Sequence, residues 1–269
     1  MQACAKRARR TMLRTAPIVA WSMWTFVSRL ASAKRNVASW KKTTERSTVS
    51  SPLAEENRLS DTQKAIIPIA AFAASGDMQK LNRALDAGLD ASLSINAIKE
   101  LLVQTYAYAG FPRSLNALGA LMKIVETRRE SGLADIVGPE PSHIAPIGQA
   151  LLDAGTRNQT ALVGAPVKGP LFDFAPAIGT FLKTHLFGDI FSRDNVDWQT
   201  RELATISMLA ALDGVDSQLQ SHLGMSLNVG LTENQLVDFV GVLSERVNQT
   251  AAARAEEAMR RLRDGKKNG

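Results

Sequence analysis

Two residues that can perform acid–base chemistry, Glu202 and His222, interrupt helical faces that otherwise look built for packing. Glu202 shares one face of a predicted helix with Ile206, and His222 shares a face of the next helix with Leu219 and Ser226. The short turn Asp-Gly-Val-Asp joins the two helices, so an antiparallel hairpin can bring the carboxylate and the imidazole together. A carboxylate that orients an imidazole is a common arrangement for proton transfer. The alternative is a buried, hydrogen-bonded pair that only fixes the packing of the helices.

The composition indicates which elements hold these residues. The chain has 269 residues, of which 45% are hydrophobic and 6% aromatic. Alanine and leucine dominate the apolar residues, and both favour helices over strands. A chain of this length can bury a sizeable core in one large domain or in two small ones. We therefore expect an all-α protein.

The positive charge of the chain is concentrated near its N-terminus. The formal net charge is +6, but residues 1–50 carry eleven Lys and Arg against one Glu, a net charge of +10. Residues 51–250 carry fifteen basic against twenty-two acidic residues, a net charge of −7. A nucleic-acid-binding surface needs Lys and Arg clustered on a folded face. We therefore expect no nucleic-acid partner.

Cysteine and histidine are too few for several classes of site. Cys4 is the only cysteine, which excludes an intrachain disulfide, a dithiol redox pair and a thiolate metal cluster. The histidines are His143, His185 and His222, from which we expect no histidine-rich metal site. His143 lies between two prolines and is predicted to be exposed in a loop. His185 ends a helix-like segment and is a candidate for lining a pocket.

Residues 1–33 have the order of a secretory signal peptide. A basic region through Arg14 precedes an apolar stretch from Ala16 to Val27 and the small residues Ala31-Ser32-Ala33. The apolar stretch is too short to span a bilayer, so we expect no stable membrane insertion once the leader is removed. The segment ARRTMLR also resembles a twin-arginine export signal. We expect a periplasmic or secreted protein; the alternative is a cytoplasmic protein with a basic arm.

The rest of the chain is predicted to contain two helical modules of similar pattern. Their alignment sets Glu100 on Glu202 and Leu118 on His222, which indicates an internal duplication with an imidazole in the second copy alone. The predicted organisation is a signal peptide (1–33), a linker (34–58), a first module without histidine (59–132), a Pro/Gly-rich connecting region (133–186), a second module with Glu and His (187–250) and a charged C-terminal tail (251–269).

Local signals place some helix ends. Ser60 and Ser94 are predicted to start helices, and Gly76 and Gly88 to end them. Proline and glycine are frequent in residues 133–186, which predicts a joint and ordered loops there.

The stretch FGDIFSRDNVDWQTRELATISMLAALDGVDSQLQSHLGMSLNVGLTENQLVDFV closely resembles the carboxymuconolactone decarboxylase family. The matching features are the Phe-Gly lead-in, an arginine in the loop, Arg-Glu opening a helix, a run of small residues, the histidine, and NVGLTENQ starting the next helix. The first module, with IKELLVQTYAYAGFPRSLNAL, looks like a histidine-free form of the same unit. Together the two resemblances cover about residues 58–250.

The resemblance implies two tandem helical modules in one compact unit and a reaction that needs no metal or organic cofactor. The implied substrate is a small carboxylated lactone or oxo-acid whose unsaturated carbonyl accepts the electrons left by carbon dioxide. By resemblance, His222 donates a proton to the resulting enolate, Glu202 orients the imidazole or holds it protonated, and Arg193 or Arg201 binds a substrate carboxylate. Either arginine can instead be a structural partner of a nearby acidic residue.

Three further residues are candidates for the same pocket: Glu100, Tyr106 and His185. Tyr108 is the second tyrosine of the first module, and its hydroxyl is considered together with that of Tyr106. Aromatic residues on a helix more often belong to the core, which is the alternative for both tyrosines.

Two other functions compete with the lyase. Family relatives that act as alkylhydroperoxidases use a Cys-x-x-Cys pair beside the histidine, but the segment from Asp213 to His222 contains no cysteine. A peroxidase or antioxidant activity of the peroxiredoxin type, which needs a thiolate, is therefore disfavoured. The other alternative is a non-enzymatic oligomeric helical binding protein. The resemblance also implies a homo-oligomer, expected as a trimer of tandem modules.

Overall fold

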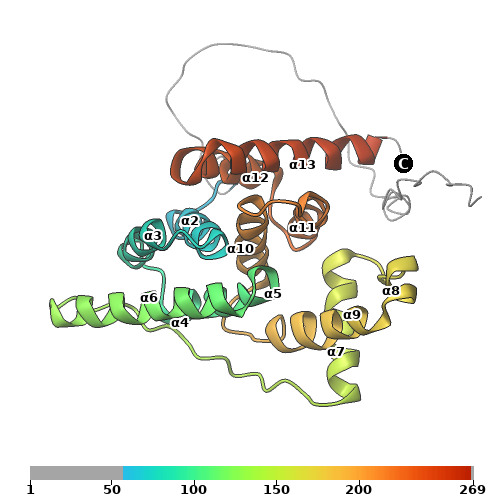
Figure 1. The fold of residues 1–269 in the computed structure, drawn as a ribbon, viewed down its shortest axis with the longest axis horizontal. Helices are drawn as coiled ribbons and strands as arrows, with labels where there is room; N and C mark the ends of the chain where they lie inside the picture. The colour runs from blue at the N-terminus through green and yellow to red at the C-terminus, as the bar shows by residue number, and fades with distance from the viewer. Residues whose placement is uncertain (1–56, 268–269) are drawn as a thin grey trace, which may run out of the picture.

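The described part of the chain is built from helices and their connections. The computed structural model describes residues 57–267, and no strand occurs within that range (Figure 1). The prediction of an all-α fold is confirmed. The predicted signal peptide (1–33) and nearly all of the predicted linker (34–58) lie outside the described residues. In chain order the elements are α2 (Asp61–Ser75), α3 (Met78–Asp90), α4 (Ile95–Gln104), α5 (Tyr106–Ala109), α6 (Phe111–Glu130), α7 (Gln149–Val163), α8 (Pro170–Phe174), α9 (Pro176–Phe181), the π-helix η2 (Leu182–Ile190), α10 (Trp198–Ala210), α11 (Asp216–Asn228), α12 (Glu233–Val242), the π-helix η3 (Leu243–Val247) and α13 (Gln249–Lys267).

Helix α2 lies at the centre of the core. Ser60 starts it as predicted, because its side chain accepts a hydrogen bond from the backbone N–H of Gln63 while the Gln63 side chain accepts one from the N–H of Ser60. Gly76 ends it in the left-handed conformation, with φ 79°. All residues from Ala65 to Ala74 are buried, so α2 is covered on all sides. It packs mainly against α3 and α10 (Figure 1).

The first module continues through α3 to α6. Ser94 starts α4 as predicted, by accepting a hydrogen bond from the N–H of Ala97. The prediction that Gly88 ends a helix was wrong, because α3 continues to Asp90. A Cβ atom at Gly88 would lie 2.7 Å from Cδ1 of Ile69. The glycine therefore serves the close packing of α3 against α2.

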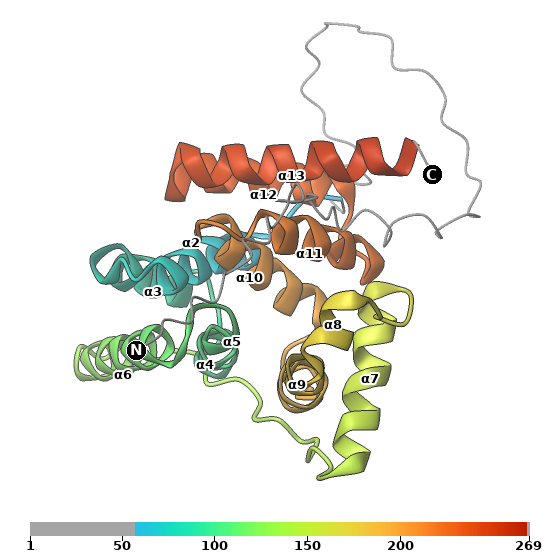
Figure 2. The same ribbon diagram turned by 45° about the vertical axis from the view of Figure 1, so that its right-hand side comes forward.

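The connecting region contains more helix than its proline and glycine content predicts. Helix α7 and the continuous unit of α9 and η2 pack against each other, beside α8 and below α10 and α11 (Figure 2). Their contact is close, since a Cβ atom at Gly155 would lie 1.6 Å from the carbonyl oxygen of Lys183. The expectation that His185 ends a helix was wrong, because the helical backbone continues through it to Ile190.

Residues 187–250, the predicted second module, contain α10, α11 and α12, which α13 covers. Asp197 caps α10 by accepting hydrogen bonds from the N–H and hydroxyl of Thr200. Residues 251–269 are not merely a charged tail: Ala251, Ala255 and Met259 are buried along one side of α13. This apolar stripe packs on α11 and α12, while charged residues of α13 such as Arg260 and Arg261 are exposed. Figure 1 shows α13 lying across α11 and α12.

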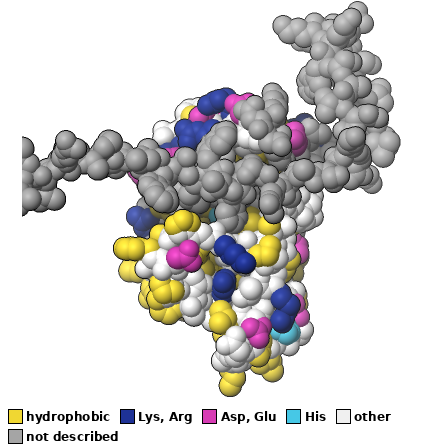
Figure 3. Space-filling view, turned by 90° about the vertical axis from the view of Figure 1, so that its right-hand side faces the viewer, with side chains coloured by type: hydrophobic (Ala, Val, Ile, Leu, Met, Phe, Trp, Pro, Cys, Tyr) yellow, Lys and Arg dark blue, Asp and Glu magenta, His cyan; other side chains and the backbone are white. Residues whose placement is uncertain are grey.

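Several large apolar side chains lie on the surface. On α6, Phe111, Leu115 and Met122 are each more than 60% exposed and share one helical face. Phe174 and Phe181, from α8 and α9, are also exposed, and Figure 3 shows hydrophobic side chains gathered on the side of the molecule that carries these short helices. Within residues 57–267, no helix combines the length and apolar character that crossing a membrane requires.

Candidate active site

Glu202 and His222 meet across the hairpin of α10 and α11. The Nδ1 atom of His222 lies 2.8 Å from Oε2 of Glu202. The Glu202 side chain is fully buried, and the His222 side chain is 9% exposed. Both helices point these residues into the core because their apolar neighbours, Leu203 and Leu223 among them, are buried there as well. The pairing predicted from the sequence is therefore present in the structure.

The hydrogen bond determines which imidazole nitrogen is available for chemistry. Nδ1 of His222 is held by Glu202, so Nε2 is the nitrogen left to exchange a proton with a ligand. The hydroxyl of Ser226 donates to the backbone carbonyl of His222 and fixes the same helical turn. The second oxygen of Glu202, Oε1, is buried and has no hydrogen-bond partner among the described residues. A buried carboxylate oxygen without a partner is costly and marks a place where a polar ligand atom or water can bind.

Tyr108, from the short helix α5, lies against this pair. Its ring meets the imidazole of His222 edge to face, with centroids 5.6 Å apart and an interplanar angle of 79°. Its hydroxyl is buried and has no hydrogen-bond partner in the described range. Burial, and then the negative charge of Glu202, raise the pKa of the Tyr108 phenol more than the nearby hydroxyl of Thr205 lowers it, so the hydroxyl stays protonated. The first module thus contributes an aromatic residue to the surroundings of His222.

The two predicted substrate-binding arginines are both bound to Glu100. Arg193 donates from Nε and from one terminal nitrogen to the two carboxylate oxygens of Glu100, at 2.7 and 2.6 Å. Arg201 donates to the same carboxylate at 3.2 Å, to the side chain of Gln104 at 3.3 Å, and to the backbone carbonyl of Arg193. Arg201 is fully buried, whereas the Arg193 side chain is 38% exposed. Neither arginine pairs with the acidic residues nearest to it in sequence.

This cluster affects the charges of its members. Burial alone would raise the pKa of Glu100, but the hydrogen bond from Arg193 and the positive charges of Arg193 and Arg201 outweigh it and hold that pKa below its ordinary value. Desolvation lowers the pKa of Arg201, and the charge of Glu100 opposes this effect. Glu100 is therefore the buried centre of an ion-pair cluster between the modules, rather than an open pocket residue.

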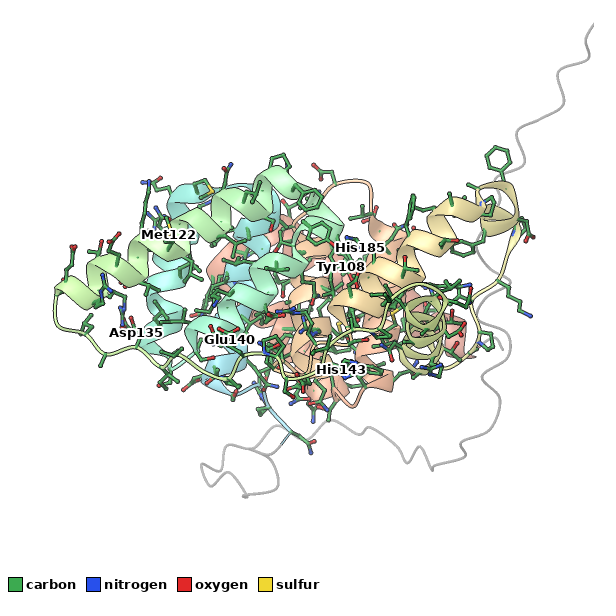
Figure 4. The ribbon with its side chains drawn as sticks, turned by 90° about the horizontal axis from the view of Figure 1, so that it is seen from below. Tyr108, Met122, Asp135, Glu140, His143 and His185 are labelled. Carbon is green, nitrogen blue, oxygen red and sulfur yellow. The ribbon has the colours of Figure 1, made fainter. Side chains whose placement is uncertain are left out.

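The other two candidate pocket residues, Tyr106 and His185, form a separate group. The Tyr106 hydroxyl hydrogen-bonds to Nε2 of His185, whose Nδ1 lies 2.9 Å from Asp189. Figure 4 marks the position of His185 in the view from below. The side chains of His185 and Asp189 are 54% and 43% exposed, so this group joins α5 to η2 at the surface. The spacing of His185 and Asp189, four positions on one helix, is the sequence signal that would have found Asp189.

Two hollows lie on the surface of the described residues, and one of them is lined by a candidate site residue, Arg193. One, of about 520 Å³, is lined by α11 and α13 residues that include Asp216 and Arg254. The other, of about 420 Å³, is lined by residues that include Arg193, Trp198 and the exposed His143. Neither cavity is lined by Glu202 or His222. In the range 57–267, no group of three or more His, Cys, Asp or Glu residues is placed to hold a metal ion.

The comparison with known proteins identifies the segment that carries the Glu–His pair. Residues 176–261, from α9 to α13, match the Carboxymuconolactone decarboxylase family. The 4-carboxymuconolactone decarboxylase of Acinetobacter baylyi is 33% identical over 70 residues, which are 26% of this chain and 52% of that relative. The chain thus spans about half the length of the curated relative it matches. The resemblance of this segment to the family is confirmed; the duplication, whose first copy lies outside the match, stays a prediction.

Proposed function

We propose that the chain is a cofactor-independent lyase that releases carbon dioxide from a small carboxylated lactone or oxo-acid. The observation that carries the proposal is the 2.8 Å contact between His222 Nδ1 and Glu202 Oε2 within the family segment. The name of the relative suggests 4-carboxymuconolactone as the first substrate to test. The high-energy intermediate of such a reaction is an enolate, and a buried carboxylate–imidazole pair is suited to protonating it.

The reaction consists of the loss of carbon dioxide followed by protonation of the enolate that remains. The bond between the substrate carbon and its carboxylate breaks, carbon dioxide leaves, and the electron pair moves into the unsaturated carbonyl to form an enolate. Nε2 of protonated His222 then gives its proton to the enolate carbon, and a proton from water restores the imidazolium. Glu202 orients the ring and stabilises its charged form. Because His222 exposes only 9% of its side chain, productive binding requires the surrounding helices to separate.

Of the two arginines, Arg193 is the one we assign to the substrate carboxylate. Its side chain is 38% exposed, whereas that of Arg201 is fully buried and held by Glu100, Gln104 and a backbone carbonyl. A guanidinium that already binds one carboxylate keeps further N–H donors for another acceptor. Arg201 then has a structural role between the modules.

The experiment that tests this function is a screen of unsaturated carboxylated lactones and oxo-acids for release of carbon dioxide. Wild type, His222→Ala and the control Lys123→Ala are compared. Lys123 is an exposed residue of α6, outside the Glu–His pair and outside the hollow that Arg193 lines. Turnover by wild type and by the Lys123 variant, with loss in His222→Ala, supports the proposal. Absence of turnover in all three proteins across the panel contradicts it.

The alternative peroxidase function has less support. A thiol peroxidase needs a reactive thiolate, and the sole cysteine, Cys4, is not in the segment that matches the family. A peroxide assay with a dithiol donor, carried out before and after Cys4→Ser, distinguishes the two activities. Thiol-dependent turnover that Cys4→Ser abolishes would favour the peroxidase.

Assembly and location complete the proposal. The exposed apolar face of α6, formed by Phe111, Leu115 and Met122, supports a homo-oligomer, for which a trimer of tandem modules remains our prediction. The residue pattern of the leader supports export to the periplasm or the medium, with the cytoplasm as the alternative. N-terminal sequencing of the protein purified from the cytoplasmic fraction, the periplasmic fraction and the medium tests the location, because an exported protein should begin after Ala33.

A further inference from the structure

Tyr108 and Glu202 form an unusual pair of unsatisfied groups. The Tyr108 hydroxyl and Oε1 of Glu202 are both buried, and neither makes a hydrogen bond among residues 57–267. The hydroxyl of Thr205 lies near enough to Tyr108 to affect its pKa, but it already donates to the carbonyl of Arg201 and accepts from Gln104. Buried polar atoms nearly always have a hydrogen-bond partner, so two without one around a single side chain call for a functional explanation. Both border His222, one through its hydrogen-bonded carboxylate and the other through its ring.

The position of Tyr108 in the core explains how the hydroxyl is held. Tyr108 packs against all three apolar clusters of the described structure, including Leu186 and Phe187 from η2 and residues of both modules. Packing on several sides fixes the direction of a phenol ring without any hydrogen bond to its oxygen. In the closed arrangement of the helices, packing therefore holds the hydroxyl beside His222 and Glu202, where a developing negative charge needs a donor.

We infer that the Tyr108 hydroxyl donates a hydrogen bond to the substrate oxygen that becomes negatively charged when carbon dioxide leaves. This inference rests on the proposed function and deepens it. The predicted first module has Leu118 where the alignment sets His222, so it lacks an imidazole of its own. It then supplies the Tyr108 hydroxyl to the site that contains His222. A ligand of this site must carry a carbonyl or enolate oxygen next to the carbon that His222 protonates.

The charge state of the phenol agrees with this role. Burial and the nearby Glu202 carboxylate raise the pKa of Tyr108 above its ordinary value. The hydroxyl therefore stabilises an enolate oxygen by hydrogen bonding and keeps its own proton, while the proton that reaches carbon comes from His222. The electron pair of the broken bond ends on the enolate and then in the new carbon–hydrogen bond, so no oxidant or reductant is involved.

The test compares Tyr108→Phe with Ser114→Ala. Both variants remove one buried hydroxyl from the first module, but that of Ser114 donates to the carbonyl of Leu102 at 2.7 Å, whereas that of Tyr108 is unpartnered. Tyr108→Phe should keep or raise the melting temperature, and Ser114→Ala should lower it. With a substrate found in the screen, Tyr108→Phe should lower kcat by about 10²-fold, as expected for one lost donor to an oxyanion, while Ser114→Ala keeps it.

A binding measurement decides the inference independently of turnover. The probe is tetronate, a five-membered lactone that is an enolate anion at neutral pH, and its affinity is measured by calorimetry. We expect wild type and Ser114→Ala to bind tetronate with similar affinity, and Tyr108→Phe to bind it at least about tenfold more weakly. A tenfold loss of affinity corresponds to about 1.4 kcal/mol, the size expected for one hydrogen bond to a charged acceptor. Equal binding by wild type and Tyr108→Phe, or no binding by wild type, overturns the role of Tyr108. If no substrate of the panel is turned over but tetronate still binds and the binding depends on Tyr108, the proposed lyase activity is contradicted and the role of Tyr108 is kept.

Discussion

A terminal nitrogen of Arg201 lies 3.2 Å from Oε2 of Glu100, although the two residues are 101 positions apart in the chain. The alignment of the modules sets Glu100 on Glu202, so the glutamate of one module binds the arginine beside the glutamate of the other. Both side chains are buried, at 0% and 6% exposure. This contact ties α4 to α10 and thereby fixes the helix that carries Glu202.

Arg201 should contribute more to stability than Arg193. Arg201→Met removes the donor to the Gln104 side chain and leaves Glu100 with Arg193 alone, and we expect a loss of about 3 kcal/mol in the free energy of unfolding, typical of a broken buried ion pair. Arg193→Met removes a partner that is 38% exposed and should cost less. Urea denaturation of both variants measures the difference. Equal losses of unfolding free energy in the two variants would show that the buried contact of Arg201 with Glu100 contributes no more than the contact of Arg193.

The pKa of Glu100 predicts acid sensitivity. Because this pKa is lower in the folded protein than its ordinary value of 4.5, the ionised carboxylate stabilises the fold at pH values above 4.5. That stabilisation is lost as the pH falls from 4.5 through the lowered pKa. Glu100→Gln should therefore be less stable than wild type at pH 7, and the gap should narrow below pH 4.5. Denaturation midpoints at several pH values test this, and a gap independent of pH would refute it.

Glu202→Gln should impair turnover more than folding. A glutamine oxygen can still accept the hydrogen bond from Nδ1 of His222, but it lacks the negative charge that stabilises the imidazolium. We expect kcat to fall by about 10²-fold or more, within the usual range for losing acid–base assistance. The control is Glu245→Gln, which changes an exposed carboxylate on η3. Activity close to wild type in Glu202→Gln would assign the pair a packing role.

Two glycine substitutions should act in opposite directions. Gly155→Ala would place a Cβ atom 1.6 Å from the Lys183 carbonyl oxygen, so α7 must move away from η2. We expect a loss of about 1–3 kcal/mol in the free energy of unfolding, as for other overpacked sites. In α6, a Cβ at Gly119 meets no atom within 4 Å, and Gly119→Ala should gain about 0.5–1 kcal/mol. Thermal unfolding monitored by circular dichroism compares the two.

The exposed face of α6 should govern assembly. Leu115 is 63% exposed between Phe111 and Met122, and Leu115→Glu would place a charge in the middle of this apolar face. We expect the variant to have a lower mass by light scattering than wild type at the same concentration. Asn116→Glu, on the same helix but outside this face, is the control. A wild-type protein that is already monomeric would refute the predicted oligomer.

The sequence predicted those features that depend on local spacing. The caps at Ser60 and Ser94 and the pairing of Glu202 with His222 follow from residue types a few positions apart and from one short turn. The alanine stripe of α13 was missed because charged residues dominate its composition. Gly88 was misread because a glycine that permits close packing looks the same in sequence as one that ends a helix.

Contacts between distant segments were beyond local reasoning. Nothing near Arg193 or Arg201 indicates that Glu100 is their common partner, since the contact depends on how α4 crosses α10. The two tyrosines are separated by one residue on α5, and spacing alone does not show which of them faces His222. The packing of α5 between the two modules decides it in favour of Tyr108.

The complete burial of α2 has a consequence for synthesis of the protein. This helix is among the first parts of the described chain to leave the ribosome, yet α10, which covers one of its sides, begins at Trp198. More than a hundred residues must be translated before that partner exists, at a pace of about 5–20 residues per second. The newborn chain therefore exposes an apolar, aggregation-prone helix for several seconds before α10 can cover it.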